Sequence, residues 1–326
     1  MFGQSFLPYI ADHSSEDVWT RWIHSYGGWV PYLLPAKQVL GKSFETFYTQ
    51  WKASLETQFL ALKTQLEAEG LTTFDVVSDG EDICYGPAYS PSGDQLVFSC
   101  SDRAEGSSIL SLEEKADSPK TLLENHFAKA IRWRADGKAF VFSTPHSVGF
   151  YNLYEDIYFH ELGSKSTKAL TAAKRAKDPV FSPNGSDLIM VRNKAQDNNL
   201  FRMRIDQTLE ALTNHTDHTQ YSTPVFSPNG RFMALSKWQA GYRDIWIYDR
   251  EGQPYRRISA DTHIDRDPAF SADGKTLFFS SDRTGIPNLF AFELETEKLW
   301  QVTNVLGGAF QPSPHPSATQ IAFQSY

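Results

Sequence analysis

One short pattern recurs along most of this chain: an apolar segment, a tight polar turn and a second apolar segment. Three clear copies of the turn are Ser182–Gly185, Ser227–Gly230 and Ser271–Gly274, and weaker copies precede and follow them. The turn glycines are separated by 44, 48, 45 and 44 residues, and they are Gly93, Gly137, Gly185, Gly230 and Gly274. A repeat of about 45 residues that is made of strands predicts a radial β array.

Each repeat has room for four strands, which we call A to D in chain order. Strands A and B flank the turn, where glycine allows the positive φ of a tight hairpin. Ile245–Tyr248 and Leu289–Phe292 are typical of strand C. Strand D ends in an apolar residue and then Thr or Ser, as in Leu170-Thr171, Leu212-Thr213, Ile258-Ser259 and Val302-Thr303. Four strands in a repeat of this length form one blade of a β-propeller.

The points at which the first and last repeats begin and end predict the number of blades. Five repeats are complete, and residues 309–326 supply only strands A and B of a sixth. Residues 72–78 have the pattern of a strand D without a preceding A, B or C, and we expect them to pair into the last blade and close the ring. We therefore predict a six-bladed β-propeller with five complete blades and a partial sixth. An unpaired sheet edge promotes association, which favours a natural protein that continues beyond Tyr326 over an imperfectly closed ring.

The first 70 residues have a different period. From Phe44 to Leu66, apolar residues recur three and four positions apart, which predicts a long amphipathic helix. Ser43 is its expected N-cap and Gly70 its end, and a helix is also expected between Pro31 and Gly41. The predicted organisation is mainly β, with a small helical module at 1–70 and a propeller at 71–326.

Composition excludes several classes of protein. The net charge is −8 and the sequence pI is about 5.6, whereas nucleic-acid binding needs an excess of Lys and Arg on one face. We therefore expect no nucleic acid as partner. The sequence contains no apolar stretch of 18 residues, so we predict no transmembrane segment. The first residues have neither the basic region nor the apolar region of a signal peptide, so a secreted protein would have its signal outside this chain.

The turns resemble a known family of repeats. Phe181–Gly185, Phe226–Gly230 and Phe270–Gly274 are similar to the WD40-like PD40 repeat of TolB-type propellers, and Ser101–Arg103 and Ser281–Arg283 are similar to the Ser-Asp-Arg that follows strand B there. The resemblance covers about 72–326. It implies a six-bladed propeller, most often extracytoplasmic in bacteria, and similar blades form non-catalytic domains of prolyl-oligopeptidase-like and tricorn-like proteases.

A second resemblance concerns the helical module. Phe2–Phe6, Tyr26–Pro31, Gly41–Phe44 and Trp51 resemble the last helices of a gluzincin-type metallopeptidase domain. In that family the zinc-binding helix lies upstream of these helices, and this chain lacks it. The resemblance therefore assigns no catalytic residue.

No motif for catalysis is complete. None of the nine histidines belongs to a His-Glu-x-x-His helix, and no Gly-x-Ser-x-Gly elbow or glycine-rich phosphate loop occurs. We expect no catalytic residue and no cofactor.

Loop residues are the candidates for binding. In a propeller the D–A and B–C loops share one face, which we call the loop face. His215, Asp217 and His218 precede blade 4, and His263, Asp265 and Asp267 precede blade 5. These six residues could converge at the mouth of the channel, where His215 and His218 could bind a divalent metal. We favour the alternative, in which they are polar loop residues that cap strands and face water, and we expect no bound metal.

Aromatic residues and an insertion also point to the loop face. Tyr151, Tyr154, Trp238 and Tyr242 are expected in its loops, and aromatic residues are frequent at interface hot spots. Blade 2 has 33 residues between Gly137 and Leu170, against 27 to 29 in the other blades, with the excess near residues 145–155. Insertions specific to one repeat often mark the binding face. Some of these rings could instead pack against the helical module.

The two cysteines flank one hairpin. If position 89 lies opposite 96, then Cys84 lies opposite about 101, close to Cys100. A cross-strand disulfide is then feasible in an oxidising compartment.

The sequence favours a non-catalytic propeller that binds a protein or peptide. Its expected setting is periplasmic or otherwise extracytoplasmic, within an envelope-associated complex. The alternative is an accessory, substrate-holding region of a secreted zinc metallopeptidase whose catalytic domain lies upstream. A propeller hydrolase or lactonase with a channel metal is a third hypothesis.

Overall fold

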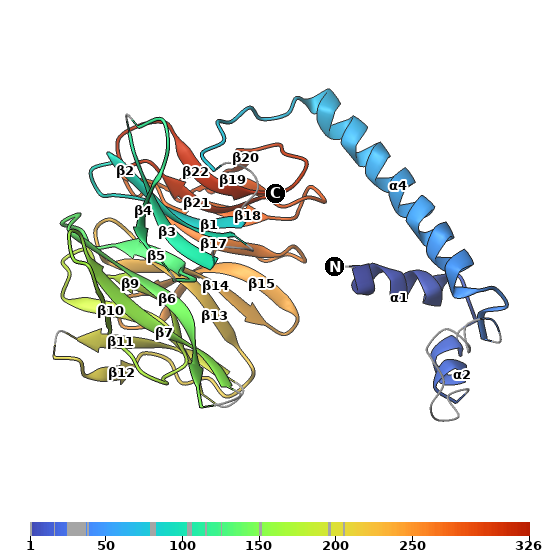
Figure 1. Ribbon diagram of the computed structural model, residues 1–326, viewed down its shortest axis with the longest axis horizontal. Helices are drawn as coiled ribbons and strands as arrows, with labels where there is room; N and C mark the ends of the chain where they lie inside the picture. The colour runs from blue at the N-terminus through green and yellow to red at the C-terminus, as the bar shows by residue number, and fades with distance from the viewer. Residues whose placement is uncertain are drawn as a thin grey trace. The chain divides into compact units, whose positions relative to one another are not determined.

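The computed structural model contains two compact units, Met1–Gly70 and Leu71–Tyr326 (Figure 1). The residues that it describes are 2–15, 17–24, 37, 39–78, 83–102, 106–114, 116–124, 126–149, 152–194, 197–204 and 206–326.

The first unit is helical. It contains α1 (Phe2–Asp12), α2 (Val18–His24) and the long α4 (Phe44–Glu69). Ser43 caps α4 as predicted, because its Oγ accepts a hydrogen bond from the Thr46 N–H at 3.1 Å. Most of the helix predicted from Pro31 to Gly41 lies outside the described residues; Lys37, Val39 and Leu40 are helical.

One small core holds these helices together. Aromatic and aliphatic side chains from α1, α2, α4 and the segment before α4 form it: Phe6, Ile10, Val18, Val39, Phe47 and Trp51. Beyond the first turns of α4 the apolar residues Phe59 and Leu60 are exposed. Of the predicted amphipathic stripe, Phe47, Trp51 and Leu66 are buried, whereas Tyr48 is exposed.

The second unit consists of antiparallel sheets. Five sheets have four strands each, in the order β1-β2-β3-β4, β5-β6-β7-β8, β9-β10-β11-β12, β13-β14-β15-β16 and β17-β18-β19-β20. The bounds of strands A and B of these blades are β1 (Ile83–Tyr89), β2 (Gln95–Asp102), β5 (Lys129–Trp133), β6 (Ala139–Val148), β9 (Ala176–Phe181), β10 (Asp187–Lys194), β13 (Gln220–Phe226), β14 (Phe232–Gln239), β17 (Asp265–Phe270) and β18 (Thr276–Ser281). The bounds of strands C and D are β3 (Gly106–Glu113), β4 (Lys120–Leu123), β7 (Asn152–Glu161), β8 (Thr167–Ala169), β11 (Asp197–Arg204), β12 (Leu209–Ala211), β15 (Tyr242–Asp249), β16 (Pro254–Arg257), β19 (Asn288–Glu293) and β20 (Leu299–Gln301). The unit is a β-propeller, and its five four-stranded blades confirm that part of the prediction.

A sixth blade, even a partial one, is not shown. The chain ends in a two-stranded sheet of β21 (Ala309–Pro314) and β22 (Ile321–Ser325), which contacts β1 on one side, while β21 contacts β17 and β18 on the other. Residues 72–78, predicted as a closing strand, form no strand. Thr72 exchanges two hydrogen bonds with Asn304, of 2.9 and 2.8 Å. The prediction was wrong because no strand C stands beside β22 to give this segment a ladder partner.

The repeated turns explain the sequence motif. In each turn the glycine N–H bonds the carbonyl three residues earlier, as from Gly230 to Ser227 at 2.8 Å, and Gly230 has φ +69°. The Ser227 hydroxyl donates to Asn229 Oδ1 at 2.8 Å. A β-carbon at Gly230 would lie 3.4 Å from Pro183 of the preceding blade. The proline and the glycine of successive turns therefore lie against each other around what we call the turn face.

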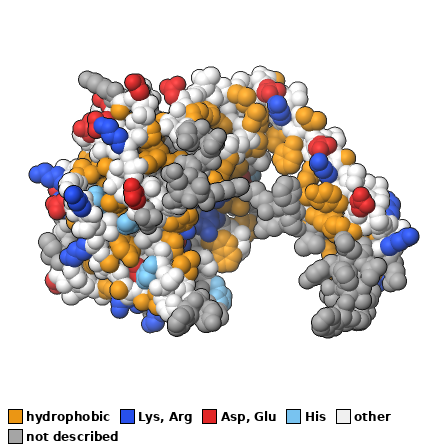
Figure 2. Space-filling model, viewed as in Figure 1, with side chains coloured by type: hydrophobic (Ala, Val, Ile, Leu, Met, Phe, Trp, Pro, Cys, Tyr) orange, Lys and Arg blue, Asp and Glu red, His pale blue; other side chains and the backbone are white. Residues whose placement is uncertain are grey.

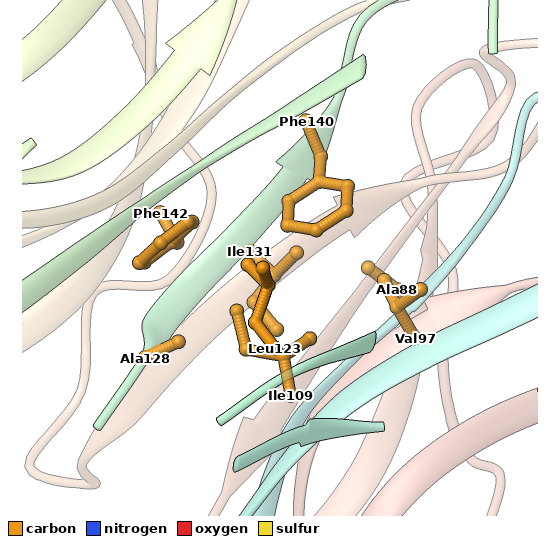
Figure 3. Packing of buried hydrophobic residues seen from close by; sticks show 8 residues of the cluster. All are labelled: Ala88, Val97, Ile109, Leu123, Ala128, Ile131, Phe140 and Phe142. Atoms are coloured by element: carbon orange, nitrogen blue, oxygen red, sulfur yellow. The ribbon is translucent and has the colours of Figure 1, made fainter. Parts of the chain in front are cut away.

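The apolar core lies between neighbouring blades. Figure 3 shows one such cluster, in which Ala88, Val97, Ile109 and Leu123 of blade 1 face Ala128, Ile131, Phe140 and Phe142 of blade 2. Equivalent clusters join blades 3 and 4 and blades 4 and 5.

The Thr or Ser after strand D closes each of blades 2 to 5. The Thr213 hydroxyl donates to Asn199 Oδ1 at 2.9 Å and accepts the Leu200 N–H at 2.9 Å. Thr171, Ser259 and Thr303 accept the corresponding strand C amide, at 2.8 to 3.0 Å. The Leu-Thr signal therefore marks a buried hydrogen bond to strand C.

Candidate functional site

The innermost strand of every sheet has the same irregularity at the same place. A register shift interrupts its pairing with strand B, and one residue there has a positive φ between 49° and 68°. Five of these residues precede a proline; all six line one cavity of about 270 Å³, and they are Gly86, Ala130, Asp178, Thr223, Asp267 and Gln311. The bulges therefore form a ring around the axial channel.

Side chains of this ring bond to the backbone of the next strand. Asp178 Oδ2 accepts the Thr223 N–H at 3.2 Å, and Gln311 Oε1 accepts the Gly86 N–H at 2.7 Å. The second of these bonds connects the last sheet to the first blade. Ser313, whose hydroxyl accepts the Tyr89 N–H at 3.0 Å, strengthens the same connection. Side-chain bonds to the backbone thus join the two ends of the propeller where a shared strand was expected.

A second cavity of about 340 Å³ occupies the other end of the channel. It lies at the turn face, and its wall includes the turn prolines Pro91, Pro183 and Pro228 together with Phe226 and Phe270. Arg132 lines both cavities. It occupies a position where the other strands have Ala88, Val180, Val225, Ala269 and Ser313. Arg132, together with Pro87 and Pro312, therefore lies where the two cavities meet.

The polar cavity contains charges of both signs. Asp178 and Asp267 line it with Arg132, and the guanidinium charges of Arg243 and Arg266 act on the same carboxylates. Burial raises the pKa of Asp267, and the charge of Asp178 raises it further, while Arg266 and Arg132 lower it. Burial likewise lowers the pKa of Arg132 and Arg243. Figure 2 shows Lys and Arg side chains in a shaded recess of the β unit.

A long hairpin forms part of the rim. Strands β6 and β7 have ten residues each and contain the inserted residues 145–148 and 152–155. Lys129, beside the cavity, pairs with Glu155 of the hairpin at 2.8 Å. The Arg175 guanidinium donates to the Tyr154 hydroxyl at 2.7 Å and lies 4.3 Å from its ring centre. Leu153 is 67% exposed. The insertion therefore lies at the loop face and is attached to the mouth of the channel.

The histidine loop before blade 4 is held by blade 3. Asn199 accepts the His215 N–H at 2.7 Å, and Asp197 accepts the His218 N–H at 2.8 Å. Asp217 Oδ1 lies 3.7 Å from His215 Nδ1, and its other oxygen accepts from Gln239 at 3.1 Å. Through these contacts the residues of the histidine loop cap the ends of neighbouring strands.

The loop before blade 5 makes its own set of contacts. His263 Nδ1 lies 3.7 Å from Asp282, and the buried Asp265 pairs with Arg283 through two contacts of 3.2 Å. The Asp282 carboxylate also accepts the Ile264 N–H at 2.8 Å. Ser281–Arg283 is thus used structurally; Arg103 of the other copy lies outside the described residues.

The structure does not bring the six candidates into one cluster. Only Asp267 reaches the channel cavity. In the described part of the chain, no three His, Cys, Asp or Glu side chains are grouped as metal ligands. Tyr242 is 47% exposed, Trp238 is half-buried, and Tyr151 lies outside the described residues.

Cys84 and Cys100 form a disulfide, with Cα atoms 4.1 Å apart. They lie directly opposite each other, one residue from the predicted register, since the bulge at Gly86 shifts the pairing.

Sequence reasoning missed the arginines of the channel. They lie in three different strands, and only an alignment of the six inner strands on their bulges marks Arg132 as exceptional.

Fold and site together define a β-propeller with a polar axial channel and no assembled catalytic group among the described residues. Residues 212–326 match the family model PD40, TolB beta propeller domain. This part of the β-propeller is therefore similar to the TolB beta propeller domain.

Curated relatives and a solved structure are also similar to this chain. An uncharacterized protein of Agrobacterium fabrum is 25% identical over 101 residues, which are 31% of this chain and 34% of that protein. The Tol-Pal system protein TolB of Helicobacter hepaticus is 33% identical over 69 residues, 21% of this chain and 16% of the relative. The chain thus matches about a third of the length of the first of these curated relatives and less of the second. The solved structure of putative TolB from Agrobacterium tumefaciens shares the fold, with a TM-score of 0.65 and 19% identity over 77% of this chain and 93% of that one.

Across the described residues, no helix has both the length and the apolar content needed to span a bilayer. The resemblance of residues 1–70 to a metallopeptidase domain is not shown by these comparisons and stays a prediction.

Proposed function

We propose that this chain is a non-catalytic propeller that binds a protein or peptide partner at its loop face. The observation that carries the proposal is the contrast between the two ends of the channel. The turn face repeats one motif, whose prolines and glycines lie against each other around a cavity of about 340 Å³. The loop face differs from blade to blade and has an open polar cavity, an extended hairpin and exposed Leu153 and Tyr242.

The comparisons support the setting of this proposal. One relative is named as a protein of the Tol-Pal system, and a disulfide at Cys84–Cys100 is compatible with an oxidising compartment. We therefore propose a periplasmic or otherwise extracytoplasmic location and a partner within an envelope complex. The accessory region of a zinc metallopeptidase remains the alternative, and an upstream His-Glu-x-x-His in the natural protein would favour it.

Site-specific photocrosslinking tests the proposed face. A benzophenone amino acid replaces Leu153 or Tyr242 on the loop face, and Tyr255, 65% exposed near the turn face, is the matched control. We expect a discrete adduct from the first two positions in producing cells and none from the third. Adducts of equal yield from all three positions, or from Tyr255 alone, would contradict the proposal.

A further inference from the structure

The polar cavity has more positive than negative charge around it. On its wall Lys129 and Arg132 balance Asp178 and Asp267, and the excess comes from charges behind the wall, where Lys177, Arg243 and Arg266 are opposed by Glu155. The whole chain has a net charge of −8, so this concentration of cations is local. Asp178 is already engaged, since Lys177 lies 4.0 Å from it and the Thr223 N–H bonds to it.

The guanidinium groups of the channel lack anionic partners. In the described part of the chain, no carboxylate lies within 4.0 Å of Arg132, Arg243 or Arg266, although nine other ion pairs of the propeller involve arginine. Arg266 Nε is buried and has no hydrogen-bond partner there. Arg132 donates to the carbonyl of its neighbour Ile131 at 2.9 Å, and Arg243 donates to the Ser222 hydroxyl at 2.9 Å. A guanidinium has five N–H donors, and leaving them unpaired in a buried site is costly.

A carboxylate fits this arrangement. Arginine binds carboxylates through two parallel hydrogen bonds, and Arg132 lines the floor of the cavity. The protonated form of Asp267, which burial favours, can donate a hydrogen bond to an entering anion. Arg243 and Arg266 act through their field, since neither lines the cavity.

We propose that the channel binds a carboxylate of an acidic segment of the partner, entering from the loop face, with Arg132 as its direct ligand. This inference rests on the proposed function for the identity of the ligand, a polypeptide. It adds the chemistry that the partner must present.

The test uses defined probes. The peptide acetyl-Gly-Asp-Glu-Gly-amide is compared with acetyl-Gly-Asn-Gln-Gly-amide at constant ionic strength, by calorimetry and by thermal unfolding. The variants are Arg132→Gln and, as a matched control, Arg134→Gln two residues further along, where the arginine pairs with Asp136 at 2.8 Å outside the polar cavity. We expect the acidic peptide to bind about tenfold or more tightly than the neutral one, and Arg132→Gln to remove that difference while Arg134→Gln keeps it.

Stability without ligand gives a second readout. An unpaired buried charge destabilises the folded state, so Arg132→Gln should unfold at the same or a higher temperature than the parent, whereas a purely structural arginine would lower it. Equal binding of both peptides, equal loss in both variants, or saturation by inorganic phosphate in place of the acidic peptide would overturn the proposal. If the peptides fail while the Leu153 adduct persists, only this inference fails; if they bind and no loop-face adduct forms, the proposed function fails.

Discussion

Replacing Gly230 with valine should separate two costs of the repeated turn. Gly230 has φ +69°, and Gly185 has the same conformation with φ +71°. A β-carbon at Gly185 meets nothing within 4 Å, whereas one at Gly230 lies 3.4 Å from two atoms of Pro183. The preceding turn explains the difference, because blade 2 has Ala135 where blade 3 has Pro183.

In both variants a β-branched residue has to adopt the left-handed conformation, which destabilises the folded state by about 1–2 kcal/mol. Gly230→Val also forces its γ-carbons into Pro183, and overpacking of this kind costs about 1–3 kcal/mol more. For a unit of this size each kcal/mol lowers Tm by about 2–4 °C. We therefore expect Gly230→Val to unfold about 2–12 °C below Gly185→Val.

Thermal unfolding followed by circular dichroism, with urea titration as a check on the free energy of unfolding, measures the difference directly. Equal destabilisation of the two variants would refute the contact between successive turns. Parent-like stability of both would refute the turn assignment itself.

Three further outcomes are expected. Burial raises the pKa of Asp267, so the folded state keeps a proton that the unfolded chain loses near pH 3.9, and this contribution to stability falls as pH rises above about 3.9. The stability of Asp267→Asn should therefore decline less steeply with pH and be greater than that of the parent at pH 7, with a residual slope from Asp244, whose pKa burial also raises. A steeper decline in the variant would contradict this. Arg283→Met leaves the buried Asp265 unpaired and should cost about 3–5 kcal/mol in urea unfolding, with recovery on adding Asp265→Asn; no recovery would disprove the pairing. Reduction of Cys84–Cys100, 16 residues apart, should cost about 3 kcal/mol, checked against Cys84→Ser/Cys100→Ser, and unchanged stability in both would mean that the bond does not form.

The repeated turns and the end of strand D could be predicted because their physics is local. A Ser-Pro-Asn-Gly turn contains its own hydrogen bonds, as Ser227, Asn229 and Gly230 show. The register at Cys84 could not be predicted to the residue, since the bulge at Gly86 depends on the channel. Residues 72–78 have the composition of a strand but not the neighbour that a strand needs.

The candidate site was predicted less well for a similar reason. His215 and His263 are polar loop residues, and the structure engages each with its own local partners. Arg132, Arg243 and Arg266 are far apart in sequence, and only the closure of the ring brings their charges near Asp178 and Asp267. Contacts across the channel depend on the number and order of blades, which no single segment encodes.

Because the apolar clusters lie between blades, a blade separated from its neighbours would expose an apolar surface to water on both of its faces. Limited proteolysis should therefore yield the intact ring or small peptides and no persistent single-blade fragment. For the same reason, insertions and deletions in this region should preserve the fold only when they comprise whole repeats. Deletion of half a blade would expose the apolar face of the neighbouring blade.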